Sequence, residues 1–417
     1  MKKKILLIIV IVLIIAGSVF SHFGGFGTGE SADSQELAKY AMNMEELSIP
    51  ENTRIIALGE ATHGNKEFQQ LKLDVFQILV ERYGIRGFAL EADYGCCERV
   101  NRYIHGGEGT VKEATEALGF TIYKTNEMGN LIEWMRSFNE TAQEGNDLRF
   151  YGFDMQRTDY NRQYLLEAAK AMNLDTSKLE QLSDSLSLDD KEAIYSDIKE
   201  QMLAAEKGQD IDVSIHFADI LLQNIAIGKV YEENFAEANG VRDKYMADNT
   251  LWILEQEERR NNHMIFISAH NGHVEQFGTY VGGSQKVMGN LLADTLGKDQ
   301  YYAIGTDFYK TTCNMPTSNG KRVTHTFYSH DPLAKAANMN DYDMCYLDFS
   351  KIPDDSSLSK YINDYIYMGN LGDNPIDGLN GIIFHVLPQA YRIWQCPSLL
   401  YDSLIIVTNA HPIVVNQ

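Results

Sequence analysis

Short, mostly apolar runs recur along the chain, and several of them end at a glycine or an acidic residue. Runs of this length without strict alternation are typical of strands that are covered on both faces of a parallel sheet. The predicted strands cover residues 54–58, 87–90, 148–154, 264–268, 301–305, 344–348, 381–384 and 403–407.

Helical periodicity separates the first two predicted strands. Apolar residues at helical spacing run from residue 65 to residue 83, and Gly84 is a usual helix end. This strand–helix–strand unit predicts a parallel crossover. A long, proline-free helical pattern at about residues 160–258 predicts an inserted helical subdomain or cap. We therefore predict an α/β fold over residues 36–417, with a mostly parallel central sheet flanked by helices and a helical insertion.

The N-terminus has a different pattern. Three lysines at positions 2–4 precede an apolar run over residues 5–20, which is the order of a secretory signal peptide. The run is slightly shorter than the ~20 apolar residues of a relaxed membrane-spanning helix. Cleavage after Ser21 and retention of residues 1–21 as a membrane tether both stay open, and either predicts an extracellular or cell-surface location. Residues 22–35, rich in Gly and Ser, are predicted to be a flexible linker.

Composition narrows the classes of partner. The chain has 36 Lys and Arg against 58 Asp and Glu, a formal net charge of −22, and no basic run beyond the N-terminal lysines. Such a surface repels phosphate backbones, so no nucleic-acid partner is expected. The five cysteines lack CxxC spacing, and disulfides among the distant ones and buried free thiols both remain open. Cys96 and Cys97 have acidic neighbours, which weaken a thiol as a nucleophile.

The densest polar cluster follows the first predicted strand, from Gly59 to Glu67. Free amides at the start of a helix bind anions. A helix that begins near Thr62 would place Glu60 in the loop and His63 in the first turn, where the carboxylate can orient the imidazole or raise its basicity. In the alternative interpretation, Thr62 and Glu67 cap the helix and His63 is a surface residue.

A second cluster follows the fourth predicted strand, where His270 and His273 flank Asn271 and Gly272. Two histidines three positions apart face the same space when the turn is helical. A lone histidine is more often structural, but a pair directly after a buried strand favours a functional site. Glu91 adds a carboxylate at the end of the second predicted strand, where its alternative role is helix capping or ion pairing.

Three strand ends therefore carry residues suited to chemistry, namely Glu60, His63, Glu67, Glu91, His270 and His273. Because the carboxyl ends of parallel strands meet at one edge, we expect these side chains to share one site. The set suits general acid–base hydrolysis, and its residue types also suit zinc or manganese, although no HExxH-type spacing is present. Serine-esterase chemistry is not predicted, because the chain has no GxSxG motif.

These motifs resemble the erythromycin esterase family over roughly residues 40–410. The resemblance rests on Gly-Glu-x-x-His-Gly at residues 59–64, on Gly-Phe-Ala-Leu-Glu at residues 87–91 and on His-Asn-Gly-His at residues 270–273. It implies hydrolysis of an ester, in the best-known members the macrolactone of macrolide antibiotics, as a form of antibiotic resistance. It also implies that a histidine activates water directly, with no covalent intermediate, no metal and no cofactor.

Carried over residue by residue, the resemblance implies that His63 is the general base and that Glu60 orients it. Glu91, His270 and His273 would line the same pocket as catalytic residues. Lys72 and Glu67 are predicted to bind the substrate or the oxyanion. Family members typically have an arginine where this chain has Lys72, which keeps the charge but lacks the planar fork. Two alternatives stay open: a metal-dependent hydrolase that uses the same residues as ligands, and a non-catalytic surface binding protein.

Overall fold

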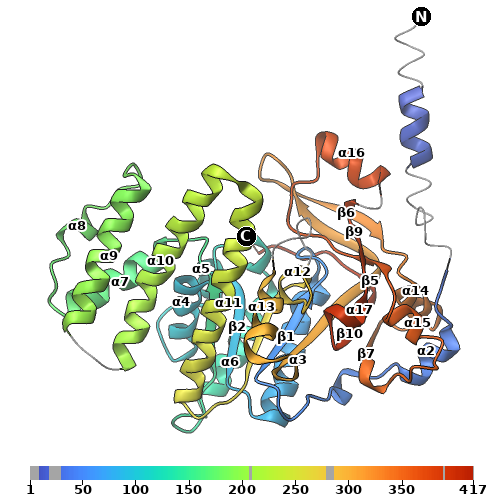
Figure 1. The fold of residues 1–417 in the computed structure, drawn as a ribbon, viewed down its shortest axis with the longest axis horizontal. Coiled ribbons are helices and arrows are strands. Elements are labelled where there is room, and N and C mark those ends of the chain that lie inside the picture. Colours follow the sequence, from blue (N-terminus) through green and yellow to red (C-terminus); the bar gives the residue numbers. More distant parts are fainter. Residues whose placement is uncertain (1–8, 18–29, 206–208, 279–285, 388–389, 417) are drawn as a thin grey trace, which may run out of the picture.

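A mostly parallel sheet forms the centre of the molecule (Figure 1). The structure is a computed structural model that describes the chain except for residues 1–8, 18–29, 206–208, 279–285, 388–389 and 417. Within the described residues, eight strands pair in the order β3-β2-β4-β1-β5-β10-β7, with β6 attached to β5. The strands are β1 (Ile55–Glu60), β2 (Gly87–Asp93), β3 (Arg149–Asp154), β4 (Ile265–His270), β5 (Tyr301–Pro316), β6 (Arg322–Tyr328), β7 (Met344–Asp348) and β10 (Ser403–Ala410). Pairs within β3-β2-β4-β1-β5-β10 are parallel, and β6 and β7 are antiparallel to their partners. The predicted fold class is confirmed.

Both faces of the sheet are buried, as the uninterrupted apolar runs predict. In β1, Ile55 and Ala57 face one core, which includes side chains of α10 (Gln209–Glu233), α11 (Phe235–Arg259) and α13 (Met288–Leu296). Ile56 and Leu58 face a second core, which includes side chains of α3 (Lys66–Tyr83) and α6 (Asn126–Asn139). The alternation of side chains along each strand therefore separates two layers of helices.

One predicted strand is wrong. Residues 381–384 lie in helix α16 (Gly378–Val386), whereas β8 (Ile366–Gly369) and β9 (Arg392–Gln395) form a small antiparallel sheet. A short apolar run cannot be assigned to strand or helix by its periodicity alone. Ile382 and Ile383 are 45% and 38% exposed, so this run is apolar without being part of a buried sheet.

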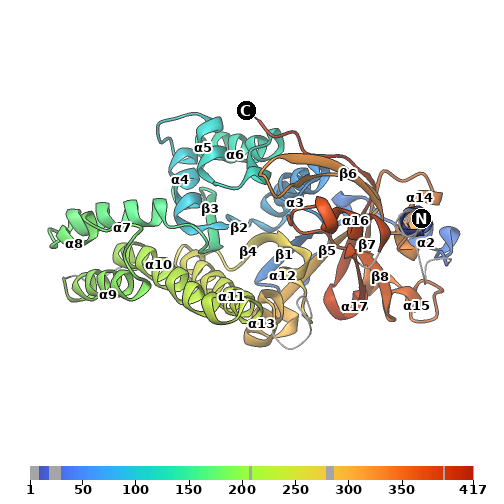
Figure 2. The ribbon, with the colours of Figure 1, turned by 90° about the horizontal axis from the view of Figure 1, so that it is seen from above.

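The region predicted as a helical insertion runs through α7 (Asp159–Ala171), α8 (Ser177–Glu180), α9 (Leu188–Ala205), α10 and α11. Figures 1 and 2 show α7, α8 and α9 at one end of the molecule, whereas α11 lies along the sheet. Among the described helices, one segment passes the length and composition test for a membrane-spanning helix. It is Ile211–Glu233 of α10. It packs against α7, α9 and α11, which is what the core helix of a folded domain does.

Little of the predicted leader falls within the described residues. Residues 9–17 form a helix with exposed apolar side chains, whereas residues 1–8, the predicted cleavage point and most of the linker lie outside the described part. The folded domain begins with α2 (Ser34–Tyr40), which starts where the linker was expected to end. The carboxylate of Asp33 caps α2 by accepting hydrogen bonds from the backbone amides of Gln35 and Glu36.

Candidate active site

The carboxyl ends of β1, β2 and β4 bring the predicted residues together. Glu60, the last residue of β1, lies in register with His270, the last residue of β4. The backbone N–H of His270 donates to Oε2 of Glu91 on β2 at 2.9 Å. His63 follows β1, and its ring centroid lies 4.9 Å from that of His270. His273, in the short helix α12 (Asn271–Val274), has its ring centroid 6.5 Å from that of His270.

A cleft of about 700 Å³ opens over these strand ends. Four predicted residues line it, namely His63, Glu91, His270 and His273, together with Arg242 and Asp243 of α11. Its apolar lining includes Phe120, Ile122, Leu371, Phe384 and Ile393. A cavity of this size with mixed lining accommodates a small organic molecule.

Glu60 lies behind His63 and fixes its imidazole. Nδ1 of His63 contacts Oε1 of Glu60, and Nζ of Lys72 donates to Oε2 of the same carboxylate at 2.5 Å. Burial raises the pKa of Glu60, but the charges of Lys72 and His63 outweigh it and lower that pKa to about 2. Burial lowers the pKa of His63, and the charge and hydrogen bond of Glu60 more than offset this, so the pKa is raised above its ordinary value. Since Nδ1 is held, Nε2 is the nitrogen available to the cleft.

His273 belongs to a second carboxylate–histidine pair. Its Nδ1 lies 2.7 Å from Oδ1 of Asp243, and its Nε2 lies 3.3 Å from Nη1 of Arg242 and 3.4 Å from Oε1 of Glu91. Burial lowers the pKa of His273, but the charges of Asp243 and Glu91 outweigh it and raise that pKa. Burial also acts on Glu91, yet His273 and Arg242 hold the pKa of Glu91 well below its usual range. The pair is therefore hydrogen-bonded and lies at the cleft.

His270 differs from its two neighbours. Its Nδ1 accepts a hydrogen bond from the backbone N–H of Gly272 at 3.3 Å. Burial and the nearby charge of His63 lower the pKa of His270 to about 3. At neutral pH His270 is therefore a neutral imidazole between two histidines whose pKa values are raised.

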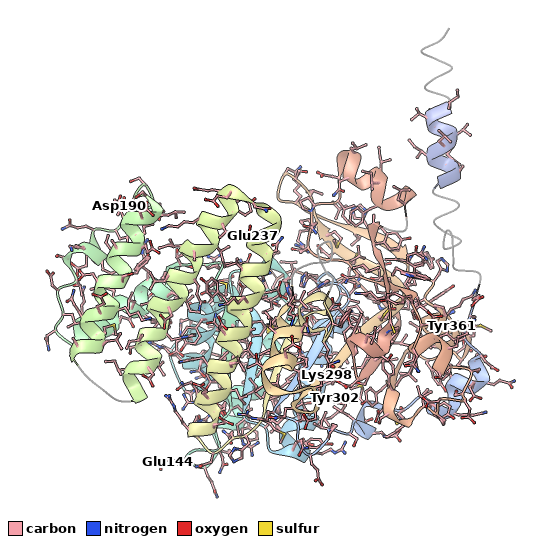
Figure 3. All side chains as sticks on the ribbon, viewed as in Figure 1. Glu144, Asp190, Glu237, Lys298, Tyr302 and Tyr361 are labelled. Atoms are coloured by element: carbon pink, nitrogen blue, oxygen red, sulfur yellow. The ribbon has the colours of Figure 1, made fainter. Side chains whose placement is uncertain are left out.

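Arg242 and Asp243 are site residues that sequence reasoning missed. Helix α11 starts on the carboxyl-end side of the sheet, as Glu237 marks in Figure 3, and continues toward the start of β4. Arg242, about two turns into this helix, thereby lies beside the strand ends. It donates from Nε and Nη2 to Asp154 at 3.1 and 2.7 Å, and from Nη2 to Glu91 at 2.8 Å. The acidic partners Asp154 and Glu91 lie at the ends of predicted strands, whereas no local signal in the sequence points to Arg242.

Asn271, the amide residue of the His-Asn-Gly-His motif, holds neighbouring strands together. Its Nδ2 donates to the carbonyl of Thr306 on β5 at 2.7 Å, and its Oδ1 accepts from the Thr306 N–H at 3.2 Å. The hydroxyl of Thr306 in turn accepts from the backbone N–H of Ala61 at 2.8 Å. A Cβ at Gly59 would lie 2.1 Å from Oδ1 of Asn271, so the close approach requires glycine. The motif therefore joins the ends of β1 and β4 to Thr306 within β5.

Two details of the predicted helix start are wrong. Helix α3 begins at Lys66 after Asn65, so Thr62 is not its N-cap and His63 lies in the loop before it. The reason is tertiary: Leu371 N–H donates to the carbonyl of Ala61, and the first amide of the helix, on Lys66, donates to the carbonyl of His411. The Lys66 amide therefore already has a hydrogen-bond partner within the protein.

The structure does not bring Glu67 and Lys72 into the cleft lining. Both oxygens of Glu67 bind His411, at 2.7 Å to its backbone N–H and 2.7 Å to its Nδ1. Lys72 is 1% exposed and lies beneath Glu60, so it acts on the cleft through that carboxylate. Their predicted contact with substrate or oxyanion stays a prediction, and Arg242 is the one lysine or arginine among the described residues that line the cleft.

The five cysteines and the candidate metal ligands can be judged only within the described part of the chain. All five cysteines are buried and free, which decides between the two alternatives left open by their spacing. Burial and the charge of Asp93 raise the pKa of Cys96, so it is a poor nucleophile. Among the residues that the structure describes, no group of three or more His, Cys, Asp or Glu side chains is placed to hold a metal ion.

The fold and the site together define an α/β protein with ionisable residues at the carboxyl ends of parallel strands, which is where enzymes with such sheets place their active sites. The family model for erythromycin esterase matches residues 80–391, well over half of the chain. The chain therefore belongs to the erythromycin esterase family, whose members hydrolyse esters. The matched region contains Glu91, Arg242, His270 and His273, whereas Glu60 and His63 precede it.

Individual relatives agree with this assignment. The chain is 26% identical over 383 residues to erythromycin esterase type II of Escherichia coli, covering 79% of this chain and 88% of that protein. A crystal structure of a Bacillus cereus protein matches with a TM-score of 0.75 at 22% identity, covering 92% of this chain and all of that one. A mutant of the erythromycin esterase EreC in its open conformation matches with a TM-score of 0.62 at 16% identity, covering 93% and 99%. The two structural likenesses show a shared fold.

Proposed function

We propose that the protein hydrolyses an ester bond of a bulky substrate with water that His63 deprotonates, without a metal ion or a covalent intermediate. The observation that carries this proposal is the buried Glu60–His63 pair, whose imidazole opens on a cleft beside a fixed cation, Arg242. A histidine oriented by a carboxylate is the usual general base of hydrolytic enzymes.

In this mechanism Nε2 of His63 takes a proton from water, and the water oxygen attacks the ester carbonyl carbon. Glu60 stabilises the imidazolium that forms, and Lys72 keeps Glu60 ionised. Negative charge develops on the carbonyl oxygen in the tetrahedral intermediate. Arg242 is the one arginine or lysine among the described residues that line the cleft, and a preoriented donor of this kind stabilises an oxyanion.

The cleft and the relatives support the proposed substrate class. The cleft lining combines aromatic and aliphatic side chains with the histidines, the carboxylates and Arg242. Such a lining fits a bulky, partly apolar ester. The Escherichia coli relative is described as an erythromycin esterase, so a macrolactone is the first substrate to assay. Simple aryl and alkyl esters test whether the chemistry is present when the macrolactone is not the natural substrate.

The test compares the purified full-length protein with its His63→Asn variant on erythromycin and on simple esters, with and without EDTA. We expect His63→Asn to lower kcat/KM by about 10²–10⁴, the range for loss of a general base. His105→Asn is a matched control, because His105 also pairs with a carboxylate, at 2.9 Å from Asp147, but does not line the cleft. Unchanged turnover in His63→Asn contradicts the mechanism. Activity that EDTA abolishes and zinc or manganese restores supports a metal-dependent hydrolase, and binding without turnover supports a binding protein.

We also propose that the protein is exported and acts outside the cytoplasm. The support is the order of three lysines and an apolar run over residues 5–20. Fractionation of cells that express the full chain, followed by N-terminal sequencing, tests it. A mature N-terminus near residue 22 indicates cleavage, and full-length protein in the membrane fraction indicates a tether. Full-length protein in the cytosolic fraction contradicts export.

A further inference from the structure

The cleft contains two carboxylate–histidine pairs, and the mechanism above uses only one of them. Glu60–His63 comes from β1 and the loop that follows it, and Asp243–His273 joins α11 to the helix after β4. Ester hydrolysis needs two proton transfers, one from the attacking water and one to the leaving alkoxide. The mechanism above names no proton donor for the leaving alkoxide, and the Asp243–His273 pair is available for this step.

We propose that His273, oriented by Asp243, is the general acid that protonates the departing alkoxide. This inference rests on the proposed function and adds a second catalytic residue with its positioning residue. In the step, the tetrahedral intermediate re-forms the carbonyl, the bond between carbon and alkoxide oxygen breaks, and the electron pair leaves on that oxygen. The oxygen takes the proton of Nε2–H of His273. The proton held by His63 passes to solvent, and His273 regains one from the acid product or from solvent.

Hydrogen bonds around His273 suit both of its protonation states. When protonated, Nε2–H faces Oε1 of Glu91 at 3.4 Å, and when neutral, Nε2 can accept from Nη1 of Arg242 at 3.3 Å. Neither state leaves a buried donor or acceptor without a nearby partner, so the proton can leave and return at little cost. The Glu91 carboxylate stays in place during the transfer, because its other oxygen is held by the N–H of His270.

Asp243 has the geometry of a positioning residue. Its Oδ1 accepts both from Nδ1 of His273 at 2.7 Å and from the backbone N–H of Met288, the first residue of α13, at 3.0 Å. The bond to α13 fixes the carboxylate, and the carboxylate fixes the tautomer of His273 with Nδ1 protonated. Asp243 is 4% exposed and its Oδ1 is bound to both His273 and Met288, which suits a role in positioning His273.

His270 is a weaker candidate for this role. Its ring lies between the other two, but it is neutral at neutral pH, and its Nδ1 accepts from the Gly272 amide. A neutral imidazole is a poor acid for an alkoxide. The charged groups that face His273 are Asp243 and Arg242 from α11 and Glu91 from β2, with Asp154 of β3 behind Arg242 and His270 beside them. The acidic members raise the pKa of His273, which keeps it protonated to higher pH.

The experiment compares esters of one acid with leaving groups that range from 4-nitrophenol to a simple alkanol. Nitrophenolate leaves without protonation, whereas an alkoxide requires an acid. We expect His273→Asn to lower kcat/KM for the alkyl ester by about 10²–10⁴ and to leave the nitrophenyl ester nearly unchanged. His63→Asn should lower both, because both need an activated water. His105→Asn is the control that should change neither.

If His273→Asn does not fold, Asp243→Asn is a second variant that tests the general-acid role of His273. It should show the same leaving-group preference in weaker form and should move the alkaline limb of the pH–rate profile to lower pH, because the pKa of His273 falls. Equal loss for both esters in folded His273→Asn and Asp243→Asn overturns the general-acid role. Full activity of His63→Asn would instead overturn the proposed function, so the two failures are distinguishable.

Discussion

Lys72 Nζ lies 2.5 Å from Oε2 of Glu60, and neither side chain is more than 2% exposed. The other oxygen of Glu60 contacts His63. A buried carboxylate with two cationic partners on opposite oxygens stays ionised and immobile, which is what a residue that orients a general base must be. Lys72, which stands where the family resemblance implies an arginine, supplies one of these partners.

The first prediction concerns the stability of this ion pair. Lys72→Met should lower the free energy of unfolding by about 3–5 kcal/mol, because it leaves the buried charge of Glu60 with one partner fewer. Urea unfolding followed by circular dichroism measures the loss. Lys244→Met is the matched control, because Lys244 pairs with Asp248 on the surface and is 63% exposed, and its loss should be small. Equal effects of the two variants would contradict a structural role for the buried pair.

The loss in Lys72→Met should also depend on pH. With Lys72 present, the pKa of Glu60 is about 2, below the ordinary value of 4.5. Glu60 therefore contributes stability above pH 4.5, and this contribution is lost as the pH falls through about 2. In the variant that contribution is absent or smaller. The difference in free energy of unfolding between the two proteins should be largest above pH 4.5 and narrow toward pH 2. A difference that is constant over this range would contradict the assigned pKa shift.

The second prediction concerns the general base. Glu60→Gln keeps the shape of the side chain but removes the charge that raises the pKa of His63. Burial then lowers that pKa, and the base loses its proton at a lower pH. The acidic limb of the kcat/KM profile should move to lower pH, while the maximum rate falls because the imidazolium loses its stabilising partner. An acidic limb that stays in place would show that His63 is not the group titrating there.

The third prediction separates charge from geometry at Arg242. Arg242→Lys should lower kcat/KM by about 10²–10³, the range for loss of an oxyanion donor, because lysine cannot bridge Asp154, Glu91 and His273 at once. Arg102→Lys, at a surface ion pair with Glu98, is the control. Melting curves establish that both variants are folded. Full activity of folded Arg242→Lys would show that a point charge suffices at this position.

Much of this site could be predicted because its histidines and glutamates stand at or just after the ends of buried strands. The rule that parallel strand ends converge brought together Glu60, Glu91 and His270, and the residues just after the strands added His63 and His273. The fold class followed from the same runs. Local sequence was therefore sufficient where the chemistry lies directly on the sheet.

The parts that could not be predicted depend on tertiary packing. Arg242 and Asp243 lie about two turns into a long helix, where nothing in the surrounding sequence distinguishes them from surface charges. Glu67 lies close in sequence to the end of β1, but in the structure it bonds to His411 and does not line the cleft. Residues 381–384 have the composition of a buried strand, yet they form an exposed helix near the cleft. Each difference reflects contacts between segments far apart in sequence.

The last prediction concerns the junction of β1, β4 and β5. A Cβ at Gly59 would lie 2.1 Å from Oδ1 of Asn271, whose side chain bonds to both backbone groups of Thr306. Gly59→Ala should therefore cost about 1–3 kcal/mol of stability, the range for overpacking in a close-packed core, and should displace Glu60 from His63. Gly129→Ala is the matched control, because Gly129 lies inside helix α6 and an added Cβ meets only Val111 at 3.6 Å. Alanine is the better helix former by ~1 kcal/mol, so this variant should be as stable as the natural protein or more so. Thermal melting and ester turnover measured on both proteins check the prediction, and a Gly59→Ala protein with unchanged stability and activity would show that this junction of three strands tolerates rearrangement.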